Sequence, residues 1–390
     1  MKKMSLLLVL ILLISAQSVY AIPAFARRYK ISCTTCHDPF PRLKPYGDEF
    51  AGNGFVIEEE EKERDYISAG DDLLWLNRDF PIAAKFDAYA ISSDKTDVNN
   101  DLQAPWGMKI LSGGTLAKNI GYYFYFYMSE RGEVVGLEDA YIHFNNIKGT
   151  EFDIMVGQFQ TCDPLMKREL RLTFEDYMIY KQRIGQISAN LAYDKGLIFT
   201  YGIPSTGTDL VAMVVNGNGI PDAGADKLFD DDKYKNIGLR VAQGIGENIG
   251  VGGFFYYGKE AKLDMLNQPT EMTSDLMYYG PDINFVFDRL AFTGQYLIRT
   301  DSDPLFIDGD EITTTGIVAE LVFSPQYDRS RFYYTALYNR IDSDWDAADY
   351  HTATISGTYQ ISRNLRLIGE FTRDLEHENN RFVLGINSAF

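Results

Sequence analysis

The residues with the most specific chemistry stand near the start of the chain, in the run Cys33-Thr34-Thr35-Cys36-His37. Two thiols three positions apart can add to the two vinyl groups of one haem, and the adjacent histidine then lies under the iron as an axial ligand. This C-x-x-C-H run predicts one covalently bound haem c held by Cys33, Cys36 and His37. The chemistry of such a group is the transfer of single electrons.

An export signal precedes this run. Lys2 and Lys3 are followed by a short apolar stretch at residues 5–14, and a small-x-Ala cleavage site ends at Ala21. We therefore expect residues 1–21 to be a signal peptide, which agrees with haem attachment outside the cytoplasm. The formal net charge of −18 excludes nucleic acid as a partner, because no basic stripe is present to release its counterions.

The long remainder, residues 83–390, alternates between apolar and polar positions in short segments separated by turn residues. Each segment is about ten residues long, which is the length that a tilted strand needs to cross an outer membrane. The prediction is an all-β fold, a transmembrane antiparallel β-barrel of about 16 strands with a small N-terminal haem c segment. A soluble all-β domain is the alternative. The expected strands are 83–92, 106–114, 121–131, 136–146, 151–159, 197–203, 209–216, 236–243, 248–258, 275–287, 289–300, 311–323, 331–341, 350–361, 364–373 and 381–390.

The connections between these strands tend to alternate between tight turns and long loops, as in outer-membrane barrels with short periplasmic turns. The final segment, 381–390, carries Phe382, Leu384, Ile386 and Phe390 on one face, which period-two alternation turns toward lipid. Both features favour a protein of the bacterial outer membrane, in contact with its lipid. The long loops are expected at 93–105, 159–196, 217–235, 259–274, 301–310 and 342–349.

Residues 22–82 are expected to form a monohaem cytochrome c segment and a linker. A segment this small buries too little surface to be stable without an additional cross-link or cofactor, and covalent haem would serve as one. The run Glu58–Asp65 (EEEEKERD) is typical of a solvated linker or helix face. No His or Met follows His37 within this segment, so the sixth iron ligand comes from the barrel, from a lysine, from water, or is absent. The apolar residues available to wrap the haem are Phe25, Phe40, Leu43, Tyr46, Phe50 and Phe55.

The run from Ala21 to Arg27 (AIPAFAR), with C-x-x-C-H at its offset, resembles the start of outer-membrane monohaem cytochrome–porin fusions. That family includes the single-haem iron oxidases of iron-oxidising bacteria. The resemblance implies an outer-membrane haem conduit with Fe(II)-oxidase-like activity. This chain departs from the family pattern at Arg28, Tyr29 and Lys30, where the family has Gln, Thr and Gly.

A weaker resemblance lies in the barrel. Residues 136–144 (GLEDAYIHF), 156–159 (VGQF) and 168–180 (RELRLTFEDYMIY) are similar to segments of phosphate-selective porins. In such porins a long loop folds into the lumen and narrows it. The resemblance implies that residues 159–196 form this constriction, while phosphate selectivity does not transfer, because the usual basic ladder is not evident.

Alternation along two strands nominates His143 and Met155 as lumen-facing candidates for the sixth iron ligand. The hypothesis is that the haem segment plugs the lumen and one of these side chains reaches the iron. The alternative is that both are ordinary lumen or packing residues. Arg27 and Arg28 are candidate partners for the haem propionates, because guanidinium matches carboxylate geometry; solvated basic residues near the cleavage site are the alternative.

Acidic clusters fall in the expected outer loops, at residues 222–232, 301–311 and 342–349. Their charge would attract cations, including an extracellular metal-ion donor or acceptor; solvated loops are the alternative. The expected function is electron transfer between the cell exterior and a periplasmic cytochrome or other redox carrier. The competing function is a transport porin for small solutes, in which the haem is a structural plug.

Overall fold

The computed structural model describes residues 24–57, 66–67, 70–71, 74, 76–77, 80–95, 99–162, 166–224 and 226–390. The expected signal peptide with its cleavage site and the acidic run Glu58–Asp65 lie outside these residues. The described part of the chain contains no helix that is long and apolar enough to span a membrane.

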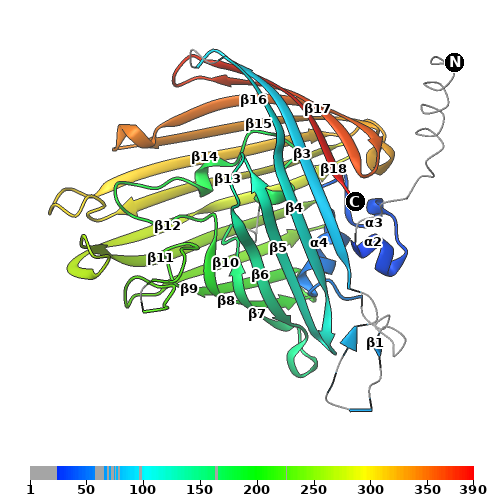
Figure 1. The fold of residues 1–390 in the computed structure, drawn as a ribbon, viewed down its shortest axis with the longest axis horizontal. Helices are drawn as coiled ribbons and strands as arrows, with labels where there is room; N and C mark the ends of the chain where they lie inside the picture. Colours follow the sequence, from blue (N-terminus) through cyan, green and yellow to red (C-terminus); the bar gives the residue numbers. More distant parts are fainter. Residues whose placement is uncertain are drawn as a thin grey trace, which may run out of the picture.

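Within the described residues, sixteen antiparallel strands close into one barrel (Figure 1). Each strand pairs with its neighbours in chain order, and β18 closes the seam by pairing with β3. Closure gives every strand two partners, so no edge is left open to lipid. The strands are β3 (Ile82–Ser93), β4 (Asn100–Ala117), β5 (Ile120–Glu130), β6 (Gly136–Phe144), β7 (Phe152–Phe159), β8 (Asp194–Ile203), β9 (Thr208–Val215), β10 (Asn236–Ile245), β11 (Ile249–Leu263), β12 (Pro269–Phe287), β13 (Leu290–Asp301), β14 (Ile312–Phe323), β15 (Phe332–Ser343), β16 (Tyr350–Ser362), β17 (Leu365–Asp374) and β18 (Asn380–Ala389).

These strands correspond one to one with the sixteen expected segments, and the predicted fold class is confirmed. Two of the expected long loops are wrong in extent. β4 begins at Asn100, and β11 and β12 stay paired as far as Leu263 and Pro269, so the turn between them is residues 264–268. Backbone pairing continues into polar sequence here because hydrogen bonds between strands do not require apolar side chains.

The two faces of the strands differ as alternation predicts. On β18, Phe382 and Leu384 are 57% and 69% exposed on the outer face, whereas Val383 between them is 1% exposed. In a membrane the outer set contacts lipid, since outer-membrane barrels turn an apolar band outward. The inward set packs against material that fills the lumen.

The N-terminal residues 24–57, here called the plug, lie at the same end of the barrel as the C-terminus (Figure 1). They form α2 (Ala24–Tyr29), α3 (Cys33–Cys36) and α4 (Pro45–Gly52). A separate two-stranded sheet pairs β1 (Tyr66–Ile67) with β2 (Leu76–Asn77). The turns at the plug end include residues 118–119, 288–289 and 363–364, which marks this end as the periplasmic one.

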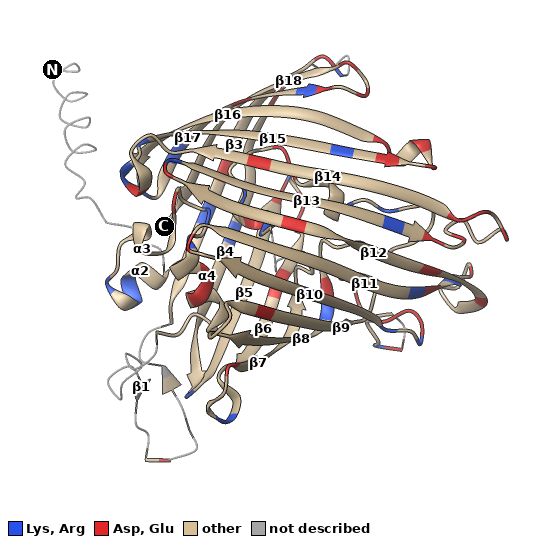
Figure 2. Ribbon diagram, turned by 180° about the vertical axis from the view of Figure 1, so that it is seen from behind, with Lys and Arg blue, Asp and Glu red and all other residues tan. Residues whose placement is uncertain are grey.

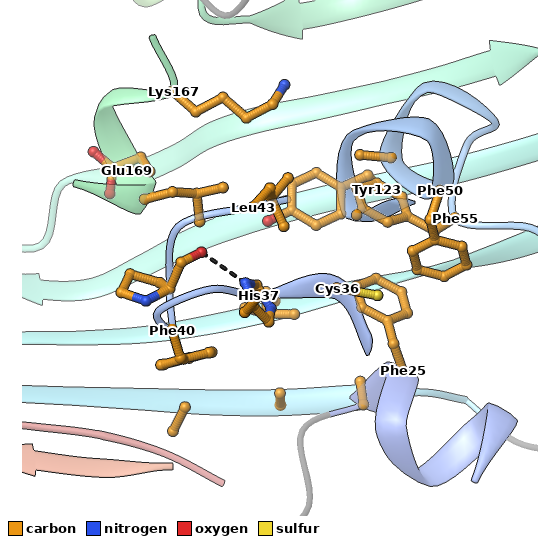
Figure 3. Close-up of a pocket in the computed structure, with 18 of the residues that line it drawn as sticks. Phe25, Cys36, His37, Phe40, Leu43, Phe50, Phe55, Tyr123, Lys167 and Glu169 are labelled. Atoms are coloured by element: carbon orange, nitrogen blue, oxygen red, sulfur yellow. Dashed lines mark hydrogen bonds between the residues drawn. The ribbon is translucent and has the colours of Figure 1, made fainter. Parts of the chain in front are cut away.

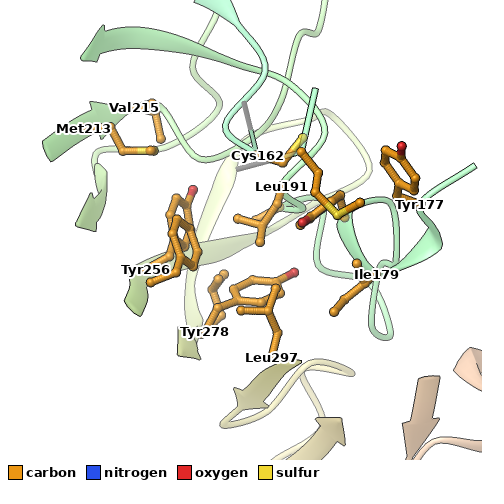
Figure 4. Packing of buried hydrophobic residues seen from close by; sticks show 14 of the residues in the cluster. Cys162, Tyr177, Ile179, Leu191, Met213, Val215, Tyr256, Tyr278 and Leu297 are labelled. Carbon is orange, nitrogen blue, oxygen red and sulfur yellow. The ribbon is translucent and has the colours of Figure 1, made fainter. Parts of the chain in front are cut away.

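The connection between β7 and β8 folds into the barrel, as the porin resemblance implies. This lumen loop (residues 160–162 and 166–193) contributes fully buried side chains such as Ile187 and Leu191. Figure 4 shows its Leu191 and Ile179 near Tyr278 and Leu297 of the barrel wall, and these residues belong to one hydrophobic cluster with Tyr177 and Tyr256. The lumen is therefore packed at this level.

Acidic residues gather at the end of the barrel away from the plug (Figure 2). They occupy the connections between strands, including residues 230–232 and 344–349. In the described residues no group of three or more His, Cys, Asp or Glu side chains has the arrangement to hold a metal ion. The acidic loops are thus a diffuse negative rim.

Candidate functional site

A single helical turn, α3, brings the three residues of the C-x-x-C-H run together. Ser32 caps it, with its hydroxyl accepting a hydrogen bond from the backbone N–H of Thr34 at 3.3 Å. The N–H of His37 then donates to the carbonyl of Cys33 at 2.9 Å. The turn ends at His37, and both cysteines and the histidine face the same cavity.

The His37 imidazole is oriented by its neighbours. Its Nδ1 lies 2.7 Å from the carbonyl oxygen of Pro41, and its ring packs edge-on against Phe40 with centroids 4.8 Å apart. A hydrogen bond at Nδ1 fixes the tautomer that presents the Nε2 lone pair, as in metal-ligating histidines. Burial lowers the pKa of His37 to about 4, so the ring is neutral at pH 7, which is the form that binds a metal.

The cavity in front of these residues measures about 220 Å³ and lies between the plug and the barrel wall (Figure 3). The plug side is made of aromatic and aliphatic side chains, among them Phe25, Phe50 and Phe55. The barrel side is made of Tyr123, Tyr125, Asp139 and Tyr141 on β5 and β6. Residues of β3, β4, β18 and the lumen loop complete it: Ala83, Lys85, Leu111, Gln160, Lys167, Glu169, Leu170 and Ala389.

Two thiols, an oriented neutral imidazole and a largely apolar cavity are together the donor set and the surroundings that haem c requires. Close packing supports the arrangement. A β-carbon at Gly47 would lie 2.3 Å from the carbonyl oxygen of Cys36, so glycine is what lets α4 approach the C-x-x-C turn. The residues present therefore fit a covalent haem.

The plug is docked against opposite walls of the barrel. Tyr333 on β15 donates a hydrogen bond to the carbonyl of Phe40 at 3.1 Å. On the other side, Asn145 donates to the carbonyl of Asn53, and the ring of Phe55 stacks on Tyr123 at 4.8 Å. Contacts on both sides hold the plug in the mouth of the barrel.

The candidate sixth ligands lie elsewhere. His143 points inward as expected and is 3% exposed, but its Nε2 is 4.0 Å from Asp153 and its β-carbon lies beside Gly54. Met155 packs against the hydrophobic cluster of the lumen loop. The cavity lining contains neither residue. The structure thus brings Cys33, Cys36 and His37 together and leaves His143 and Met155 outside their cavity.

Arg27 also lies outside the cavity lining. Its guanidinium donates a hydrogen bond to the carbonyl of Ile82 at the start of β3, and its side chain is exposed. This contact joins α2 to the barrel and does not place the guanidinium at the cavity.

Sequence reasoning missed the residues that the barrel contributes. Tyr123 and Tyr125 occupy alternate positions of β5, so alternation predicts that both side chains face inward. Nothing in the sequence, however, predicts that they lie beside the C-x-x-C-H run. Glu169 of the lumen loop accepts hydrogen bonds from Lys109 at 2.9 Å and from Tyr127 at 2.8 Å. Burial alone would raise the pKa of Glu169, but Lys109 and Arg171 hold that pKa well below its ordinary value.

No family model and no curated protein matches the chain. Solved structures do match. An anion-selective porin from Comamonas acidovorans superposes with a TM-score of 0.57 at 11% identity, covering 80% of this chain and 99% of the porin. The outer-membrane channel DcaP of Acinetobacter baumannii gives 0.57 at 12% identity, covering 80% of this chain and 97% of that channel. An in-vitro folded OmpT, an outer-membrane protein of Vibrio cholerae, gives 0.56 at 12% identity, covering 80% and 99%.

At these identities the likeness shows the fold alone, which is that of a porin. Together with the closed barrel and its apolar outer face, it places the chain in the bacterial outer membrane as a porin-like barrel. The resemblance to cytochrome–porin fusions rests on the N-terminal motif.

Proposed function

We propose that this protein is an outer-membrane electron carrier in which a covalent haem c sits between the plug and the inner wall of the barrel. The observation that carries the proposal is the position of the C-x-x-C-H run. Its two thiols and its oriented imidazole face one cavity that the barrel completes. Cys33 and Cys36 would hold the haem through thioether bonds, and His37 would be the axial ligand of its iron.

When bound, the haem supplies a site that takes up and releases one electron at a time. The chain's own residues then set its surroundings. Phe25, Phe50 and Phe55 from the plug and Tyr123 and Tyr141 from the barrel give the cavity a largely apolar lining. Such apolar enclosure tunes the reduction potential of a haem, since burial is one of the levers that the protein holds.

The position of the cavity supports a periplasmic redox partner. It is lined by Ala83 and Ala389, which lie at the plug ends of β3 and β18. One haem near that end does not bridge an apolar band about 25 Å tall by itself. We infer that a soluble periplasmic cytochrome or similar carrier exchanges electrons there, while an external donor or acceptor, such as a metal ion, acts from the side of the acidic loops.

The test begins with haem attachment to the exported protein. Haem staining on a denaturing gel should be strong for the wild type and lost in Cys33→Ala and Cys36→Ala. The matched control is Cys162→Ala, because Cys162 is buried in the lumen and is not part of the motif. A wild-type protein exported without bound haem would contradict the proposal.

A transport porin is the second candidate, and the likeness to solved porins favours it. The two candidate functions differ in whether the lumen is open to solutes. The plug and the lumen loop each fill part of it, at different heights along the barrel. Planar-bilayer conductance separates them. A holoprotein that carries large open-channel currents and whose haem does not reoxidise quickly is a porin, whereas a non-conducting barrel with fast haem reoxidation is an electron carrier.

A further inference from the structure

The cavity that faces the C-x-x-C-H run has cationic side chains only on its barrel side. In the part of the chain that the structure describes, the basic residues that line it are Lys85 and Lys167. Lys85 is on β3, and Lys167 precedes the short 3-10 turn Arg168–Leu170 in the lumen loop. Neither belongs to the plug, and most of the remaining lining is apolar.

A haem has its vinyl groups on one edge and its two carboxylate-bearing propionates toward the opposite edge. Thioether bonds to Cys33 and Cys36 would fix the vinyl edge against the plug. The carboxylates would then lie on the side of the haem away from α3, which the barrel side of the cavity could receive. Figure 3 shows the Glu169 segment of the lumen loop across the pocket from the sulfur of Cys36, with Lys167 above His37.

We propose, on the basis of the proposed function, that Lys85 and Lys167 bind the two haem propionates and so clamp the cofactor to the barrel. Two buried carboxylates need compensating cations, because an unpaired charge in an apolar cavity is costly. Lysine supplies a compact charge with three donors, which suits a carboxylate approaching from different directions. The cofactor is then shared, with its covalent bonds on the plug and its ionic contacts on the barrel.

Acidic groups of the protein also face these lysines. The Nζ of Lys85 lies 3.3 Å from a carboxylate oxygen of Asp87. Lys109, which is the cross-strand neighbour of Lys85, has its Nζ 2.9 Å from a carboxylate oxygen of Glu169. Asp139 lines the same cavity. Burial raises the pKa of Asp48 on α4, and the positive charges of Lys167 and Arg42 oppose that rise.

Asp87 and Glu169 have hydrogen-bond or ionic partners besides the two lysines. Asp87 accepts a hydrogen bond from Asn387 at 2.7 Å. Glu169 is held by Lys109 and by Tyr127, as described above, and Arg171 lies 3.9 Å from it. These carboxylates therefore stay partnered when Lys85 and Lys167 turn toward a bound propionate.

The experiment is an optical redox titration of the detergent-solubilised holoprotein, in the wild type and in Lys85→Gln, Lys167→Gln and the double variant. A nearby positive charge favours reduced haem, so each substitution should lower the ratio of reduced to oxidised haem at a fixed ambient potential, by about threefold. The matched control is Lys181→Gln. Lys181 belongs to the same loop but pairs with Asp176 at 3.2 Å and does not line the cavity.

A second readout is the dependence of the midpoint potential on pH. A propionate that has lost its lysine has a raised pKa, and reduction of the iron raises that pKa further. The potential of the Gln variants should therefore fall with rising pH in a window that lies at higher pH than in the wild type. Lys85→Arg and Lys167→Arg keep the charge and should restore the wild-type profile.

Holoprotein variants whose potentials and pH profiles match those of Lys181→Gln would overturn the clamp and leave the proposed function standing. A wild type without covalent haem would overturn the proposed function instead. Should Lys85→Gln fail to fold, as judged by the electrophoretic mobility of unheated samples, Lys167→Gln decides alone. An unchanged potential in that variant would still overturn the two-lysine clamp.

Discussion

The ring of Phe55 in the plug stacks on the ring of Tyr123 on β5, with centroids 4.8 Å apart and planes 29° from parallel. Phe55 also stacks on Phe25 of α2 at 4.8 Å. The barrel wall and the plug thus share one aromatic stack, and Tyr123 lines the cavity beside it. Docking of the plug therefore brings together both sides of the cavity lining.

Tyr123→Ala should weaken this docking. Loss of the stacked pair costs about 1.5 kcal/mol or more, roughly tenfold in the docking equilibrium. Trypsin cleavage after Arg42 in the folded protein measures the undocked fraction. Phe124→Ala is the control, because Phe124 follows on the same strand but faces outward, and its cleavage rate should equal that of the wild type.

Gly121→Ala should push the plug away from β5. A β-carbon at Gly121 would lie 2.3 Å from the carbonyl oxygen of Gly54, which is closer than any real contact of this kind. Overpacking of this sort costs about 1–3 kcal/mol. Faster hydrogen exchange of the plug amides, measured by mass spectrometry, is the expected result. The matched substitution Gly253→Ala meets no atom within 4 Å and should leave exchange unchanged.

Glu169→Gln should destabilise the lumen loop. The side chain of Lys109 is only 2% exposed. In the variant it would keep its hydrogen bond to Tyr127 but lose the carboxylate that balances its charge. Removing one member of a buried ion pair costs about 3 kcal/mol. Urea unfolding followed by tryptophan fluorescence measures the loss, and Glu133→Gln, at an exposed position, should change it little. Equal midpoints for the two variants would contradict the role of this pair.

The same carboxyl group makes stability depend on pH. Because the pKa of folded Glu169 lies well below its unfolded value, its contribution is fully present above the unfolded pKa and is lost as pH falls toward the folded pKa. We expect the difference in unfolding free energy between wild type and Glu169→Gln to shrink as pH is lowered below about 4. A difference that stays constant down to pH 2 would exclude this linkage.

His143→Ala and Met155→Ala should each leave the visible spectrum of the haem unchanged, contrary to the hypothesis that the sequence suggested. Neither side chain lines the cavity that His37 faces. His37→Ala in the same background is the positive control, since it removes the proximal ligand of the proposed site. A shifted Soret band in either of the first two variants would restore the sequence-based hypothesis for that residue.

The barrel was predictable because its signals are local. Period-two alternation and turn residues located all sixteen strands, and the face carrying Phe382 and Leu384 turned outward as expected. The extent of the β11–β12 hairpin was not predictable, because its distal residues are polar and pair through the backbone.

The site was predictable only on its plug side. Cys33, Cys36 and His37 form a motif within five consecutive positions, so their chemistry is visible in the sequence. Lys85 and Lys167 line the same cavity as these residues only because β3 pairs with β18 and the lumen loop folds inward. Those contacts depend on tertiary packing. Alternation along a strand predicts which side of the sheet a side chain points to, but it does not predict which distant residue that side chain contacts.

The pairing of β18 with β3 has a consequence for biogenesis. Ala389, near the end of β18, is part of the wall of the cavity in front of His37, so that wall is unfinished until the last strand has docked. The haem proposed for Cys33 and Cys36 would therefore meet its complete pocket only once the seam between β18 and β3 has closed.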